Sequence, residues 1–134
     1  MRLVLADIFK YEIQEIDRVH DQMVAMINEI GDCLSNSDFD SALRLVIHLI
    51  AIERKHAQYE NILLEEHRSD QLENHKGYHA KLSNLLNSMM VALGDGDQNL
   101  SISLHTQLCE AFLDDLLSAD LPFKSFLQNR IMGK

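Results

Sequence analysis

Tryptophan is absent from this chain of 134 residues, and proline occurs only once. Aromatic residues make up 6% of the sequence. A sheet sandwich is usually rich in aromatic residues and in turns that contain proline, so this shortage favours helices over a sheet fold.

Long apolar runs are also absent. No run approaches the roughly 18 residues that suggest a membrane span. The apolar stretch at the N-terminus is too short for a secretory signal. Cysteine occurs twice, at Cys33 and Cys109, without a C-x-x-C spacing. We therefore expect two buried thiols in a cytoplasmic protein.

Basic residues are scarce, since 12 lysines and arginines stand against 21 aspartates and glutamates, for a net charge of −9. Nucleic-acid binding needs a basic face, and so does an anionic membrane surface. The charge balance therefore argues against both partners.

The chain does show helical periodicity in its apolar residues. Its 46% apolar and 25% charged residues are typical of a globular protein, and its length suits a single domain. We expect one domain over 1–134 with four helices, at about 12–34, 39–66, 70–93 and 98–119. The predicted apolar stripe of the second helix consists of Leu45, Leu49, Ile52, His56, Tyr59 and Leu63.

Short connections separate these segments. The run 36–38 can cap the second helix, Ser69 or Asp70 the third, and the run 94–97 can end the third helix and cap the fourth. Short loops make neighbouring helices antiparallel, which predicts an all-α, up-down-up-down four-helix bundle. An N-terminal arm at 1–10 and a short C-terminal helical segment at 121–131 would flank it.

Polar, metal-binding residue types occupy the inward stripes of the predicted helices. They are His20, His56, His75, His79 and Asp115. A buried polar group is costly unless it is paired or bound to a metal. The pairs His56-x-x-x-Glu60 and His75-x-x-x-His79 each lie one helical turn apart and point the same way. Each pair could hold one ion or help to bridge two, or could form a hydrogen-bond network without metal.

The residues resemble the hemerythrin family, in its single-domain bacterial form. The segment 15–23, which contains His20, is similar to the family's first ligand motif, and the two spaced pairs are similar to its second and third motifs. The last helix of the family carries His-Ile-x-x-x-Asp. The matching run here is Asp115-Leu116-Leu117-Ser118-Ala119-Asp120, with Asp115 in place of the histidine.

The resemblance implies a non-haem site of two iron ions, joined by an oxo or hydroxo bridge, with O2 as its ligand. His20 and His56 would hold the O2-binding iron, and His75 and His79 the other. Glu60 and Asp120 would bridge the two ions. Ala57, Phe112 and Leu116 would line the O2 pocket. Position 57, usually aromatic in the family, is Ala here, so we expect a roomier pocket.

The role of Asp115 has three interpretations. Asp115 could bind iron and favour its ferric state, could leave an open or water-filled position, or could belong to a site with one metal, another metal or none. We expect a protein that binds O2 or another diatomic ligand, with altered redox behaviour. The alternatives are a di-iron peroxidase or oxidase and a metal-poor bundle that binds a protein partner. A sensing role would need a signalling or redox partner, which the sequence does not identify.

Overall fold

The computed structural model describes residues 2–4, 14–67, 69–120, 122, 124 and 125 of the chain. Most of these residues lie in four α-helices and one π-helical turn. The elements are α1 (Gln14–Ser35), α2 (Phe39–Glu66), α3 (Leu72–Gly94), α4 (Gln98–Asp115) and η2 (Leu116–Asp120). No strand occurs among the described residues, so the all-α fold class is confirmed.

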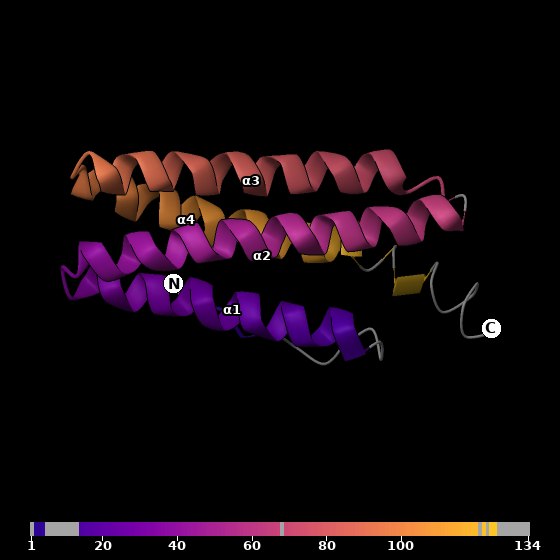
Figure 1. The fold of residues 1–134 in the computed structure, drawn as a ribbon, viewed down its shortest axis with the longest axis horizontal. Helices are drawn as coiled ribbons and strands as arrows, with labels where there is room; N and C mark the ends of the chain where they lie inside the picture. The colour runs from indigo at the N-terminus through magenta and orange to yellow at the C-terminus, as the bar shows by residue number, and fades with distance from the viewer. Residues whose placement is uncertain (1, 5–13, 68, 121, 123, 126–134) are drawn as a thin grey trace.

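The four helices lie side by side as an up-down-up-down bundle (Figure 1). Each helix packs against the next along the chain, and α4 also packs against α1 and closes the bundle. The connections are short, at residues 36–38, 67–71 and 95–97. Antiparallel neighbours follow from these lengths, as the sequence predicts.

Local hydrogen bonds explain where the helices begin. The Asp38 side chain accepts a hydrogen bond from the Ser41 backbone N–H and caps α2. The Asp97 side chain does the same for α4 through Leu100. Gly96 before it has φ +73°, a left-handed conformation that favours glycine. The predicted runs 36–38 and 94–97 therefore do contain the caps of α2 and α4.

The predicted cap of α3 is wrong. The N-cap residue is Gln71, which makes no side-chain capping hydrogen bond. The Ser69 hydroxyl instead accepts from the Gln71 backbone N–H, within the turn that precedes the helix. The turn therefore uses the serine, and α3 begins at Leu72, two residues later than expected.

The buried face of α2 is rotated from the predicted stripe by about one residue. Its buried residues are Ala42, Val46, Leu49, Glu53, His56, Glu60 and Leu64. Of the predicted stripe, Leu49 and His56 are buried, whereas Tyr59 is 37% exposed. The apolar pattern alone misplaced the face because two charged residues, Glu53 and Glu60, lie inside it.

Two buried polar contacts tie other segments to α1. Asn28 binds the backbone of Leu3 in both directions, accepting from its N–H at 2.7 Å and donating to its carbonyl at 2.9 Å. From α4, His105 Nε2 lies 2.9 Å from the carbonyl oxygen of Ile27, to which it donates. Gly31 leaves room for this imidazole, since a Cβ there would lie 2.8 Å from His105 Cε1.

The ends of the expected elements differ from the structure or lie outside it. The fourth α-helix ends at Asp115, not at 119, because the chain widens into the η2 turn before Pro122. Of the expected C-terminal segment, Pro122, Lys124 and Ser125 are helical, and the rest lies outside the described residues. The same holds for most of the predicted arm, of which only 2–4 are described.

Within the described part of the chain, no helix has the length and apolar character needed to cross a membrane. Both thiols are free. Cys109 is buried as expected, whereas Cys33 is only partly buried.

Replacing Gly31 with Ala should destabilise the bundle by about 1–3 kcal/mol, because the new methyl group forces His105 away from the Ile27 carbonyl. Thermal or urea unfolding measures the change. Gly77→Ala is the matched control, since a Cβ there meets nothing within 4 Å. It should gain about 0.5–1 kcal/mol through helix propensity. Equal stability of the two variants would contradict the predicted clash.

Candidate metal centre

Three of the four helices bring histidine and carboxylate groups together in the bundle core. His20 comes from α1, His56 and Glu60 from α2, and His75 and His79 from α3. All five side chains are buried, with exposed fractions of 6% or less. The structure therefore brings together five of the seven predicted metal ligands.

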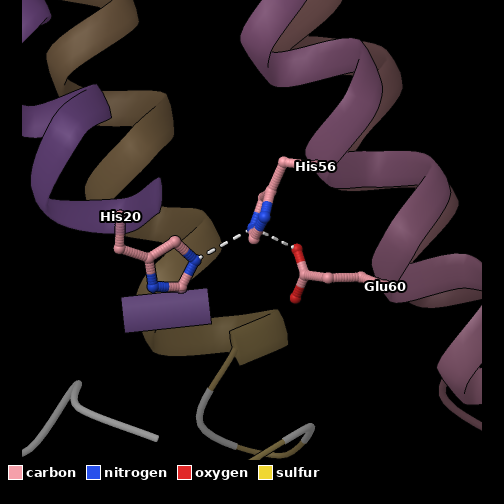
Figure 2. A group of neighbouring side chains, drawn as sticks. All are labelled: His20, His56 and Glu60. Carbon is pink, nitrogen blue, oxygen red and sulfur yellow. Dashed lines mark hydrogen bonds and ion pairs between the residues drawn. The ribbon is translucent and has the colours of Figure 1, made fainter. Parts of the chain in front are cut away.

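The first group comprises His20, His56 and Glu60 (Figure 2). The Nε2 atoms of His20 and His56 lie 3.1 Å apart across the α1–α2 interface. His56 Nε2 is 2.6 Å from Glu60 Oε1, one turn further along α2. These potential ligand atoms lie within 4.8 Å of one another, close enough to surround a single cation.

The second group comprises Glu60, His75 and His79. His75 Nδ1 lies 3.2 Å from His79 Nε2, one turn apart on α3. His79 Nε2 is 3.3 Å from Glu60 Oε1, the same oxygen that contacts His56. Glu60 thus belongs to both groups and lies between the two histidine pairs.

The electrostatics of the cluster centre on Glu60. Burial alone would raise the pKa of this carboxyl, but the charge of His56 and hydrogen bonds from His56 and His79 hold its pKa well below the ordinary value. For His79 burial has the opposite effect, because it disfavours the charged imidazolium and so lowers the pKa. Hydrogen bonds to Glu53 and Glu60 outweigh that effect and raise its pKa to about 11. Without a bound cation, a protonated His79 thus balances buried carboxylates.

Burial is the main cause of the pKa shifts of His20 and Asp115. Burial and the neighbouring charge of His56 lower the pKa of His20 to about 3, so its imidazole is neutral at pH 7 and able to bind a metal. Burial raises the pKa of Asp115 to about 7; attraction to His79 opposes this shift, and repulsion from Glu60 adds to it.

Asp115 lies close to the cluster but belongs to neither three-residue group. It is 3% exposed, and its Oδ1 atom has no hydrogen-bond partner among the residues that the structure describes. A buried oxygen in this state is costly unless a cation or a water molecule binds it.

A π-helical turn, η2, follows directly after Asp115. A π turn joins the backbone of residues i and i+5, whereas an α-helix joins i and i+4, so the regular α-helical spacing ends at Asp115. The backbone of Asp120 ends this turn, and its side chain lies outside the described residues.

The three predicted O2-pocket residues have different environments. Phe112 and Leu116 are almost fully buried, and the Phe112 ring lies edge-on to His20 with centroids 6.5 Å apart. Ala57 is only half-buried. A cleft of about 170 Å3 between α1 and α2 reaches His56 and is lined in part by Val19, Ile52 and Tyr59.

Sequence reasoning missed Glu53. Its side chain is 3% exposed, and its Oε1 atom lies 2.9 Å from His79 Nδ1. Glu53 precedes His56 by three residues and Glu60 by seven, so all three share one face of α2. This heptad spacing of charged residues could have indicated it.

His105 belongs to neither group. Its hydrogen bond to the Ile27 carbonyl and its 3.9 Å approach to Cys109 Sγ place it in the α1–α4 interface.

No protein-family model, no curated protein and no solved structure matches this chain. The resemblance to the hemerythrin family therefore rests on the residues and spacings of the sequence alone.

Replacing Asp115 with Asn should stabilise the chelator-treated protein at pH 8 more than at pH 4. The folded-state pKa of about 7 exceeds the ordinary 3.8, so ionisation destabilises the fold. This penalty is absent below about pH 4 and complete above about pH 7, where it reaches roughly 2–4 kcal/mol. Urea unfolding at both pH values measures it.

Asp114→Asn is the matched control, because the neighbouring Asp114 is exposed. Its effect should stay within about 0.5 kcal/mol at both pH values. An Asp115→Asn effect that is the same at pH 4 and pH 8 would contradict the predicted cost of ionising Asp115.

Proposed function

We propose that this chain is a hemerythrin-like, non-haem di-iron protein that binds O2 or another diatomic ligand. The observation that carries the proposal is the shared position of Glu60, whose Oε1 atom contacts one histidine of each pair, His56 and His79. A carboxylate can bridge two cations, whereas each imidazole supplies one nitrogen to one of them.

The residues present fit such a group. Imidazole nitrogens with carboxylate oxygens suit iron, and they also admit zinc or manganese. The Oε2 atom of Glu60 is buried and has no hydrogen-bond partner among the described residues, so it is free to bind a second cation. His20 and His56 would hold one ion, His75 and His79 the other, with Asp120 as the expected second bridge.

The remaining side chains would control access and polarity. Iron would supply reversible electron transfer and an affinity for diatomic molecules. The buried Phe112 ring, which lies edge-on to His20, would exclude water from that side of the cluster. The cleft that reaches His56 offers a small molecule a route from the surface. A diatomic ligand fits these features better than a bulky substrate.

Anaerobic loading with Fe(II), followed by metal analysis and an optical spectrum before and after air, tests the proposal. We expect two irons per chain and a charge-transfer band that appears in air and reverses on deoxygenation. Chelation should lower the melting temperature, because metal that binds only the folded state stabilises it by mass action.

Glu60→Gln should lower the stoichiometry at both positions, because Glu60 belongs to both groups. Glu65→Gln, at an exposed position of the same helix, should bind iron as the unchanged protein does. Less than one metal per chain in the unchanged protein would reject the proposal and favour the metal-poor, partner-binding bundle.

A di-iron oxidase or peroxidase is the second candidate. It is favoured by two further buried carboxylates near the cluster, Glu53 and Asp115. Both contribute to the charge around His79, the former through a hydrogen bond and the latter at longer range. Negative charge at a cation site stabilises the more highly charged ferric state, which shifts the chemistry from reversible binding toward reduction of O2 or peroxide.

Replacing Asp115 with His removes one of these charges and adds a nitrogen ligand. In the iron-loaded protein it should slow irreversible oxidation in air several-fold and reduce peroxide consumption with an added reductant. Stopped-flow absorbance and a peroxide electrode measure the two rates. The enzyme candidate fails if the unchanged protein consumes peroxide no faster than free iron does.

A further inference from the structure

A buried hydrogen bond connects the candidate metal centre to Glu53, which belongs to neither metal-binding group. Glu53 Oε1 lies 2.9 Å from His79 Nδ1, and both side chains are less than one-tenth exposed. The contact joins α2 to α3. A buried carboxylate is strongly unfavourable unless a partner compensates its charge, so its place in the bundle core requires a reason.

The geometry of His79 suggests that reason. Its other ring nitrogen, Nε2, lies 3.3 Å from Glu60 Oε1 and 3.2 Å from His75 Nδ1. The imidazole thus has Glu53 at one nitrogen and the ligand cluster at the other. Glu53 and Glu60 are two turns apart on α2, which places both carboxylates on the face that meets α3.

We propose that Glu53 is a positioning residue for the metal centre. By accepting a hydrogen bond from His79 Nδ1–H, Glu53 fixes the orientation of the ring and the nitrogen that carries the proton. Nε2 is then available to the cation that Glu60 and His75 also face. Histidine ligands are commonly oriented in this way by a carboxylate on the second nitrogen.

This inference rests on the proposed function and adds an asymmetry to it. Glu53 hydrogen-bonds to His79, so its influence belongs to the cation position of Glu60, His75 and His79. The position of His20 and His56 should change much less. If Glu53 and His79 formed a purely structural ion pair, replacing Glu53 would instead change the stability of the fold. It would not weaken metal binding at one position more than at the other.

Zinc titration of the full chain against a competing chelator tests the proposal, in the unchanged protein and in the variants Glu53→Gln and Glu53→Leu. We expect two zinc ions per chain in the unchanged protein. Glu53→Leu should weaken one of them by about 10–100-fold and leave the other within about threefold. Glu53→Gln should lose less affinity, because its amide oxygen can still accept from Nδ1–H.

Glu65→Leu is the matched control, since it makes the same substitution at an exposed position of α2 and should change neither affinity. NMR of the zinc-loaded, 15N-labelled protein provides a second measurement, which does not depend on affinity. It should show a slowly exchanging proton on His79 Nδ1, retained in Glu53→Gln and lost in Glu53→Leu. This readout separates positioning from a general loss of folding.

The outcomes distinguish the two proposals. Two zinc ions bound equally tightly in Glu53→Leu and in the unchanged protein would overturn the role of Glu53 and leave the metal centre standing. A proton on Nε2 instead of Nδ1 of His79 in the zinc-loaded protein would also overturn the role of Glu53. Less than one zinc per chain in the unchanged protein, together with no iron uptake, would overturn both.

Discussion

The carboxylate of Glu60 is the constraint on which the centre of this structure depends. It is fully buried on α2, and its Oε1 atom contacts His56 on its own helix and His79 on α3. His20 reaches the same cluster from α1 through His56. A buried negative charge must be compensated by protons or cations, so three helices are held in register around one side chain.

The rest of the bundle supplies what the polar cluster lacks, namely apolar burial. Side chains such as Ile30, Val46, Met89 and Leu108 are almost completely buried and form a continuous core with no charged group among them. Hydrophobic burial of this kind stabilises the fold. The helices can therefore carry several buried polar groups whose own contribution to stability is small or unfavourable.

The last helix departs most from a regular bundle. The π-helical turn after Asp115 interrupts the α-helical spacing at the point where α4 passes the cluster. Such turns are frequent at functional sites because they redirect side chains without ending the helix. With Glu53, Glu60 and Asp115 all buried, this end of the bundle carries an unusual amount of carboxylate. That load accounts for the protonated state of His79 in the absence of a cation.

The sequence by itself determined the helical class, the order of the helices, the two runs that cap α2 and α4, and five of the clustered ligand residues. Periodicity, capping and i,i+4 spacing are local properties. Only the tertiary structure decided the rotation of α2, the π turn and the partner of Glu53. Each depends on contacts between residues distant in sequence, such as Glu53 with His79. Apolar periodicity alone predicts that a glutamate such as Glu53 is exposed. Its burial becomes understandable only when the structure shows that His79 compensates its charge.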